Sequence, residues 1–397
     1  MAVSLCLMRK NLKIQPISFT NTKFFPGCAG NPFDRLLHSL EKIEKMPSLV
    51  MNILLIAFAL LGGLPELLKT HNLPLITGAL ALFFIVDWIL IALLPETRSS
   101  FGMTKITVLM LALLRVPFAL LPSGWNIGFE VAGTLLVIYG FYIEPFWIEI
   151  RHETLTSQKI ASGKSIKILH LGDLHLERTT RREKKLLALV KELQPDLILF
   201  SGDVLNLSYL NDTQAKANAV DFFKQLNAPM GVYGVSGSPA VDFPALMAKL
   251  NSDTPLQWLN NSVATLEIKG QKINLVGITC THHPDKDEQT LAALLKDNEV
   301  SGFNLLLYHS PDLAPNASRH DIDLQLSGHT HGGQVRLPLI GALYTGSLYG
   351  RIFDHGRYLV NGMPLYITRG LGMEGAIAPR VRFLCRPEIT LWEIKSK

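Results

Sequence analysis

Residues 327–334 contain two histidines, His329 and His331, that stand one residue apart between glycines. They directly follow residues 323–326, an apolar run that is typical of a buried strand. Glycines allow the backbone to bend closely around a bound ion. Imidazole nitrogens are common ligands of divalent metals, and carboxylate oxygens complete such sites for harder cations. The segment therefore indicates half of a metal site, which needs acidic partners elsewhere.

Those partners follow three other apolar runs, each of which predicts a strand. The runs cover residues 166–171, 197–200 and 304–308. In open α/β sheets the ligand crevice lies at the carboxyl ends of the strands, so the residues after these runs are expected to converge. The converging residues are Asp173, His175, Asp203, His309, His329 and His331. This mixed oxygen and nitrogen set suits two bridged divalent cations, with Mn²⁺, Fe and Zn²⁺ fitting about equally.

The order of these motifs resembles that of the calcineurin-like metallophosphoesterases, in which D-x-H, G-D, G-N-H-D/E, a lone histidine and G-H-x-H follow one another. The resemblance covers residues 165–394. It implies an α/β fold built as a two-sheet β-sandwich flanked by helices. It implies a first metal held by Asp173, His175, Asp203 and His331. It also implies a second metal held by Asp203, His309 and His329, with Asp203 as the bridge.

One block departs from the family pattern. Where the family has Gly-Asn-His-Asp, this chain has Gly237-Ser238-Pro239-Ala240. Ser238 is a candidate replacement for the asparagine ligand, whereas Pro239 has no side-chain donor to assist a leaving group. Nearby polar residues could fill the gap, so the candidate catalytic residues are Asp203, His309, Asp242 and His282. Two interpretations stay open: a second site that has been lost, or a working enzyme, which the intact remaining ligands favour.

The first part of the chain is strongly apolar, and the whole chain of 397 residues has a mean hydropathy of +0.24. A membrane-spanning helix needs ~20 apolar residues. Four stretches approach this length: residues 49–64, 73–94, 106–121 and 127–147. We expect residues 49–147 to form an all-α membrane anchor of about four transmembrane helices, with two spans plus interfacial helices as the alternative. Within these stretches, Asp87 and Arg115 are expected to form a structural pair.

The flanking segments complete the predicted organisation. Residues 1–48 form a basic N-terminal segment, residues 148–164 a polar linker, and residues 165–397 the metallophosphoesterase domain. Lysine and arginine are concentrated before the first stretch, in residues 98–105 and after residue 147. The positive-inside rule then predicts a multi-pass protein of the inner (cytoplasmic) membrane, with the catalytic domain facing the cytoplasm.

The pattern after residue 165 alternates between strands and amphipathic helices, as in βαβ units. Residues 258–278 and the C-terminal residues 365–368 and 388–393 have the pattern of further strands, which would form and complete a second sheet.

The four cysteines, Cys6, Cys28, Cys280 and Cys385, lack C-x-x-C spacing. They indicate neither a disulfide framework nor a zinc knuckle, and suit a reducing compartment.

The predicted reaction is hydrolysis of a phosphate ester or anhydride by a metal-activated water. Because Pro239 gives no help to the leaving group, a phosphate anhydride is favoured. Arginines crowd the C-terminal quarter of the chain and could bind phosphate or anionic lipid. They are Arg336, Arg351, Arg357, Arg369, Arg380, Arg382 and Arg386. Nucleic acid is not expected as a partner, because no pattern of stacking aromatic residues accompanies the arginines.

The family resemblance and the predicted anchor together suggest a phosphorylated lipid or lipid-linked nucleotide as substrate. The family includes enzymes that cleave UDP-2,3-diacylglucosamine to the lipid monophosphate and UMP during lipid A biosynthesis, and this chain resembles a divergent relative of them. Residues 337–344 could supply an apolar groove for acyl chains. The alternatives are a broad phosphodiesterase or phosphatase, and a noncatalytic metal-binding membrane receptor.

Overall fold

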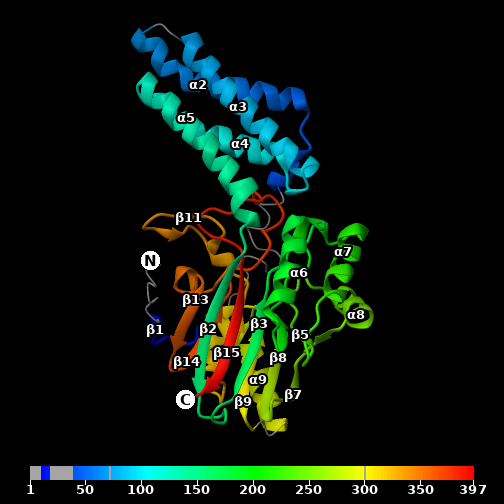
Figure 1. Cartoon of the computed structure of the whole chain (residues 1–397). Helices are drawn as coiled ribbons and strands as arrows, with labels where there is room; N and C mark the ends of the chain where they lie inside the picture. The colour runs from blue at the N-terminus through cyan, green and yellow to red at the C-terminus, as the bar shows by residue number, and fades with distance from the viewer. Residues whose placement is uncertain (1–9, 18–38, 71–72, 299–300) are drawn as a thin grey trace.

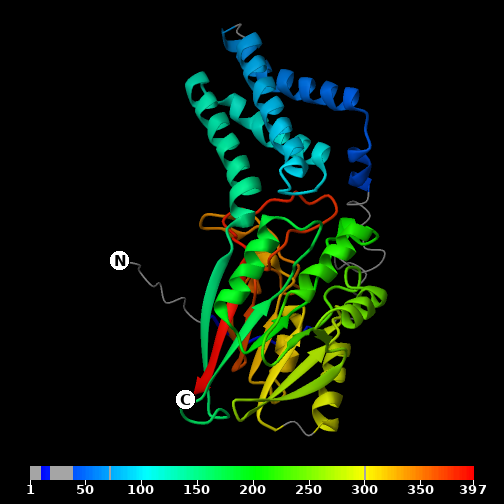
Figure 2. The same cartoon turned by 45° about the vertical axis from the view of Figure 1, so that its right-hand side comes forward.

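The computed structural model describes residues 10–17, 39–70, 73–298 and 301–397. In these ranges the chain forms a helical part, made by residues 48–146, and a larger part built on two β-sheets (Figure 1). Figure 2 shows the helical part standing at one end of the sheets. Cys280 and Cys385 are buried free thiols, and Cys6 and Cys28 lie outside the described residues.

The two sheets form a sandwich flanked by helices, which confirms the predicted fold class. One has six strands in the order β2 (Glu149–Ser157), β15 (Glu388–Ser396), β3 (Ser165–Leu171), β4 (Leu197–Phe200), β5 (Val232–Gly234) and β6 (Leu256–Trp258). The other has seven in the order β1 (Lys10–Leu12), β13 (Gly356–Val360), β14 (Met363–Ile367), β10 (Leu324–Ser327), β9 (Phe303–Tyr308), β8 (Gln271–Ile278) and β7 (Ser262–Ile268). A separate hairpin pairs β11 (Arg336–Leu337) with β12 (Gly341–Ala342).

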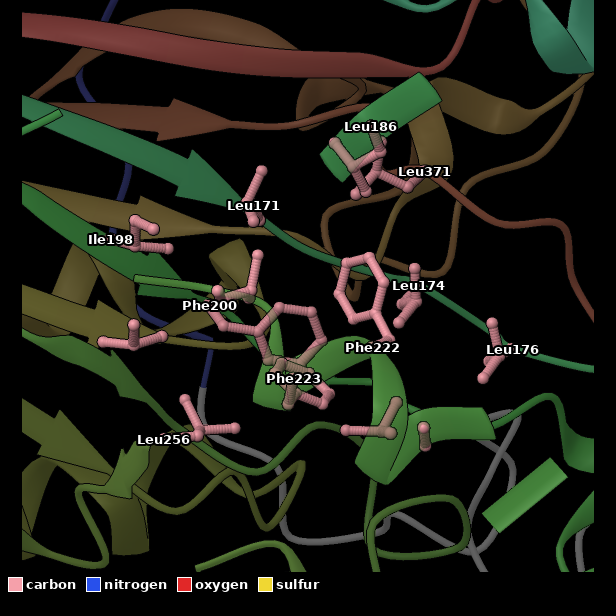
Figure 3. Packing of buried hydrophobic residues seen from close by; sticks show 14 of the residues in the cluster. Leu171, Leu174, Leu176, Leu186, Ile198, Phe200, Phe222, Phe223, Leu256 and Leu371 are labelled. Carbon is pink, nitrogen blue, oxygen red and sulfur yellow. The ribbon is translucent and has the colours of Figure 1, made fainter. Parts of the chain in front are cut away.

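Helices cover the outer face of each sheet. The six-stranded sheet packs against α6 (Arg181–Leu193), α7 (Thr213–Lys224) and α8 (Pro244–Asp253). Figure 3 shows this core, where the ring of Phe200 of β4 packs against Phe223 of α7, and Phe223 packs against Phe222. The seven-stranded sheet packs against α9 (Pro284–Asp297) and α10 (Ala314–Ala317). A third apolar layer fills the space between the sheets.

The central strands are buried on both faces. All residues of β4, β9 and β10 are buried, and alternate residues of β4 point into different cores: Leu197 and Leu199 between the sheets, Ile198 and Phe200 toward the helices. Strands buried in this way appear in a sequence as continuous apolar runs. This explains why the strands that precede the candidate metal ligands were recognisable from sequence.

Two segments lie elsewhere than expected. The predicted linker, residues 148–164, contains the edge strand β2, whose nine residues pair in parallel with β15. Within the basic N-terminal segment, β1 pairs with β13. Both are edge strands, and β2 is only partly buried, so its polar residues gave no apolar run to identify it. Most of the N-terminal segment lies outside the described residues.

The helical part comprises α2 (Ser48–Thr70), α3 (Leu73–Glu96), α4 (Thr104–Arg115) and α5 (Ser123–Ile138). A 3-10 turn, Val116–Leu120, extends α4, and a π turn, Tyr139–Ile143, extends α5. Among the described residues, Leu75–Glu96 and Gly124–Phe146 are long and apolar enough to cross a membrane, whereas the apolar stretch Ser48–Leu64 is shorter. Many of their apolar side chains are exposed in the chain on its own, as a lipid-facing surface would be.

A buried ion network ties three of these helices together. Arg115 donates from Nε and Nη2 to both carboxylate oxygens of Asp87, each at 2.7 Å. Its Nη1 donates to Glu130 Oε2, also at 2.7 Å, and Nη2 reaches Thr134 Oγ1 at 2.8 Å. The predicted pairing of Asp87 with Arg115 is confirmed, with Glu130 as a further partner.

Replacing Arg115 should therefore destabilise the helical part. Arg115→Met would leave two carboxylates buried without a counter-charge, which typically costs about 3–5 kcal/mol. We expect a lower thermal unfolding midpoint for the variant in detergent, measured by circular dichroism. Adding Asp87→Asn and Glu130→Gln removes both charges and should recover most of the loss. A single variant that unfolds like the wild type would contradict this account.

Candidate metal centre

The carboxyl ends of four strands bring the candidate ligands together. Strands β3 and β4 are parallel neighbours in one sheet, and β9 and β10 are parallel neighbours in the other. The loops after them meet at one end of the sandwich. They form two clusters, Asp173 with His175 and His331, and Asp203 with His309 and His329. Within each cluster, one ligand atom from every residue lies within 4.8 Å of the others.

The first cluster has polar atoms aimed at a common point. His331 Nε2 lies 3.0 Å from His175 Nε2, and Asp173 Oδ2 is buried with no hydrogen-bond partner. Two ring nitrogens that face each other at this distance cannot both donate a proton, and an unpartnered carboxylate oxygen is costly to bury. A divalent cation would satisfy all three atoms. The residues present therefore fit a metal ion.

Asp203 stands between the two clusters. Its Oδ2 is 3.3 Å from His175 Nε2 of the first cluster and 3.3 Å from His309 Nε2 of the second. One oxygen thus faces ligands of both clusters, which is the geometry that a bridging carboxylate needs. The arrangement describes a dinuclear centre for divalent metal ions.

The backbone at the site is strained in a consistent way. Asp173, His175, Asp203, His329 and His331 have φ values between 40° and 73°. Non-glycine residues rarely adopt positive φ, and such strain concentrates at functional sites. His282 shares it, with φ at 58°. Its presence in this group sets it apart from an ordinary loop histidine.

Hydrogen bonds and close packing hold this backbone in place. His329 N donates to Asp173 Oδ1 at 2.8 Å. A side chain on Gly328 would place its Cβ 2.3 Å from Asp173 Oδ2, and one on Gly237 would place it 2.0 Å from Asp203 Oδ1. Glycine is required at both positions because the ligand carboxylates approach the backbone directly.

Asp242 occupies a supporting position instead of a catalytic one. Its carboxylate accepts the backbone N–H groups of Asp203, Val204 and Gly237 at 2.7–2.9 Å. Burial and the nearby charge of Asp203 raise the pKa of Asp242 to about 6. The prediction that Asp242 is catalytic is therefore corrected to a positioning role, because spacing along the chain did not reveal which way the side chain points.

Ser238 and His282 lie beside the second cluster. Ser238 Oγ is 3.4 Å from His309 Nε2 and 3.3 Å from His282 Nε2. The buried His282 ring lies 4.9 Å from that of His329, measured between centroids. The side chain of Pro239 is exposed. Thus His282, on the loop after β8, reaches the gap left by the altered Gly-Ser-Pro-Ala block.

The ionisable groups influence each other strongly. Burial raises the pKa of Asp173 to about 6. Burial lowers the pKa of His175, but its hydrogen bond to Asp203 and the charges of the nearby carboxylates of Glu374, Asp203 and Asp173 together outweigh this and raise the pKa to about 9. Burial, helped by neighbouring histidines, holds the pKa of His329 and His331 well below the ordinary value. Burial and His309 lower the pKa of His282 as well. The lowered pKa values keep His329, His331 and His282 neutral, which is the form of imidazole that binds metals.

Sequence reasoning missed several supporting contacts. The carbonyl of Gly346 lies 3.1 Å from His329 Nε2 and orients that ring. Glu374 Oε2 lies 4.0 Å from His331 Nε2, at the edge of the first cluster. Both residues follow the histidine motif in loops without a strong pattern. Only the glycines around residues 370–375 mark the second of these loops in the sequence.

Three of the seven C-terminal arginines are held in contacts within the protein. Arg369 pairs with Glu388 at 2.6 Å, and Arg380 pairs with Glu177 at 2.6 Å. Arg382 is fully buried and donates to the carbonyls of residues 369, 370, 372 and 385. The seven arginines were expected to include phosphate or lipid contacts, and these three are not among them, because each is buried and bonded to groups within the protein.

The chain is similar to known proteins across the region that holds the two clusters. Residues 166–333 match the family model described as Calcineurin-like phosphoesterase. The UDP-2,3-diacylglucosamine pyrophosphatase LpxG of Chlamydia trachomatis is 23% identical over 66% of this chain and 93% of its own length. The solved structure of the calcineurin-like phosphoesterase YfkN from Bacillus subtilis aligns with 52% of this chain and 82% of its own, with a TM-score of 0.35 and 15% identity.

A further relative shares most of its length with this chain. The uncharacterized metallophosphoesterase YkuE of Bacillus subtilis is 33% identical over 266 residues, which cover 65% of this chain and 89% of YkuE. The region that the family model matches, residues 166–333, holds both ligand clusters. The chain therefore belongs to the calcineurin-like metallophosphoesterases and is a metal-dependent hydrolase of phosphate esters.

Proposed function

We propose that this protein is a membrane-anchored phosphoesterase that hydrolyses the phosphate anhydride of a lipid-linked nucleotide. The observation that carries the proposal is the position of the metal centre, at the end of the sandwich that joins the helical part. Glu149, just after the helices, pairs with Glu388 of β15, and Thr390 of β15 pairs with His170 of β3. The loop holding Asp173 therefore starts beside the point where the helical part ends.

The chain's path supports an anchor that leaves the sandwich and returns to it. Strand β1 precedes the helices, and β2 follows them, yet both belong to the sandwich. Any membrane crossing between them must then occur an even number of times. The loop between α3 and α4 also returns, since Phe101 N donates to Glu177 Oε2 at 3.0 Å and Tyr209 OH donates to the Phe101 carbonyl at 2.7 Å.

These contacts favour four crossings over two. α3 and α5 both end near the sandwich, so α2 and α4 would run away from it. On the sandwich side, Arg98 follows α3 and Lys105 lies in the first turn of α4, whereas Lys69, in the last turn of α2, lies on the distal side. By the positive-inside rule, the catalytic domain then faces the cytoplasm of the inner membrane.

Each ligand has a defined role in this proposal. Asp173, His175 and His331 would hold the first ion, His309 and His329 the second, with Asp203 shared between them. When bound, two divalent ions such as Mn²⁺, Fe or Zn²⁺ supply an activated water and stabilise charge on the phosphate oxygens. His282 takes the place of the family's asparagine beside Ser238.

The substrate follows from the leaving group and the relatives. Pro239 offers no proton to a leaving group, which favours a substrate whose leaving group is already good. A relative is named UDP-2,3-diacylglucosamine pyrophosphatase. The proposed reaction adds water across one P–O bond of the pyrophosphate of UDP-2,3-diacylglucosamine, giving the lipid monophosphate and UMP. This is the step expected in lipid A biosynthesis.

Removing the shared ligand should abolish turnover. Loss of an outer contact to a metal ligand alone typically costs ~10–100-fold, so Asp203→Ala should lower Mn²⁺-dependent UMP release by more than ~100-fold. The assay uses the full chain in detergent, with UDP-2,3-diacylglucosamine as substrate. Asp253→Ala is the matched control, because Asp253 lies on the surface, where it pairs with Lys249 and Ser252.

Two outcomes would change the assignment. UMP release that survives Asp203→Ala would show that the described centre is not the active site. If the wild type releases no UMP but cleaves bis-(p-nitrophenyl) phosphate, and Asp203→Ala does not, the enzyme is a broad phosphodiesterase without lipid preference.

His282 should be needed for full metal occupancy. We expect His282→Ala to weaken binding of the second ion, whereas His283→Ala, one residue further and only half-buried, should not. Equilibrium dialysis against Mn²⁺ with elemental analysis should then give fewer bound ions per chain for His282→Ala alone. Ser238→Asn, which restores the family's ligand type, should recover occupancy in the His282→Ala background. An equal number of bound ions per chain in all variants would show that His282 does not contribute to binding of the second ion.

A further inference from the structure

A hairpin just after the histidine motif carries a group of exposed apolar side chains. Its strands are β11 and β12, and its tip is formed by residues 338–340. The exposed fractions are 37% for Leu337, 109% for Leu339, 51% for Ile340, 54% for Leu343 and 55% for Tyr344. Single exposed apolar residues are ordinary, but a contiguous group of this kind marks an interaction surface.

The tip of the hairpin is not built from the usual turn residues. Leu339 has φ at 65°, a conformation that turns normally fill with glycine, asparagine or aspartate. It is also fully exposed, so the leucine gains nothing from burial within the chain. Leu339 is therefore unfavourable in two ways, in its backbone conformation and in its exposure to water. An apolar environment outside the protein would explain why a leucine stands here.

The hairpin is fixed to the end of the last apolar helix. Arg336 N donates to the Phe383 carbonyl at 2.9 Å, and Phe383 N donates to the Gln334 carbonyl at 3.0 Å. The Phe383 ring packs edge-on against Tyr139, in the turn that extends α5, with centroids 6.0 Å apart. Figures 1 and 2 show β11 and its orange hairpin at the end of the sandwich nearest α5.

Residues near this point have the composition of a membrane interface. Tyr139, Tyr142 and Trp147 lie at the end of the apolar segment Gly124–Phe146, as in the aromatic belts of membrane proteins. The Arg386 guanidinium lies 4.2 Å from the centre of the Trp147 ring. The exposed Arg351 donates to the Ile340 carbonyl beneath the hairpin tip. Arg386 also donates to the Trp147 carbonyl and lies 3.9 Å from Glu149, so the exposed Arg351 is the arginine placed to meet anionic lipid headgroups.

We propose that residues 336–344 form a membrane-contact hairpin that inserts into the leaflet from which α5 emerges. The occupant of this surface is anionic phospholipid, because the apolar group is tied to the end of the apolar helix α5 and is accompanied by the exposed Arg351. This inference rests on the membrane anchor of the proposed function. Since His331 precedes β11 by only a few residues, the hairpin would hold the metal centre at headgroup height, where a lipid phosphate enters it from the side.

An insertion measurement tests the proposal without using catalysis. Leu339→Cys is prepared in a background with Cys6→Ser and Cys28→Ser, labelled with the environment-sensitive dye NBD, and reconstituted into vesicles of phosphatidylethanolamine and phosphatidylglycerol. We expect a blue-shifted emission that is lost when lipids carrying a shallow doxyl quencher are included. Glu267→Cys, exposed on the edge strand β7, is the matched control and should show neither effect.

The possible outcomes separate the two proposals. The protein can float with the vesicles while the label at position 339 shows the same emission and quenching as the label at position 267. In that case the membrane-contact hairpin is overturned and the anchor stands. If the protein does not float, the anchor and the hairpin both fail. A blue shift without doxyl quenching that grows with protein-to-lipid ratio would assign the hairpin to contacts between copies of the chain and overturn the lipid as occupant.

Discussion

The structure of the site depends on one buried carboxylate. Asp203 Oδ2 lies 3.3 Å from a histidine of each ligand cluster, and the residue is only 3% exposed. An isolated charge is very costly to bury, so Asp203 requires its partners as much as they require it. Burial raises the pKa of Asp203, but His309 and His175 outweigh this and hold the pKa well below its ordinary range. The charged form of Asp203 is thus stabilised by His175 and His309, the same residues that would bind the metal ions with it.

The loops around Asp203 are held by backbone contacts that leave its oxygens available. Asp242 fixes the backbone of Asp203, and Gly237 leaves room for the Asp203 carboxylate. On the other side, Arg382 donates to the carbonyls of Gly370 and Gly372, in the loop packed against Asp173. Arginines that might have served substrate binding act instead as internal cross-links. This support allows strained, positive-φ ligands to persist.

The same end of the sandwich combines the metal centre, the α3–α4 loop and the hairpin after the histidine motif. Glu177, two residues after His175, accepts hydrogen bonds from Phe101 of that loop and from Arg380. The helical part is therefore in direct contact with a ligand-bearing loop. The position of the helices can influence the geometry of the centre through these contacts, without any change in the strands.

The six residues of the two clusters could be found from sequence alone. Each follows a strand that is buried on both faces, and such strands leave continuous apolar runs that locate their own carboxyl ends. The sandwich and the Asp87–Arg115 pair were recognisable for related reasons, since apolar patterning and isolated charges in apolar stretches are local signals. The apolar helices were equally visible in composition.

Only the tertiary structure decided the position of the polar edge strand and the contacts around the site. Strand β2 is a polar edge strand that depends on β15, more than 200 residues away, for its conformation. The orientation of Asp242, the internal use of Arg369 and Arg382, and the approach of His282 to Ser238 all result from contacts between distant segments. The sequence by itself determined which side chains could bind metal and which strands present them. It did not determine which neighbours those side chains meet, because that depends on how the two sheets pack and on where irregular loops cross their common end.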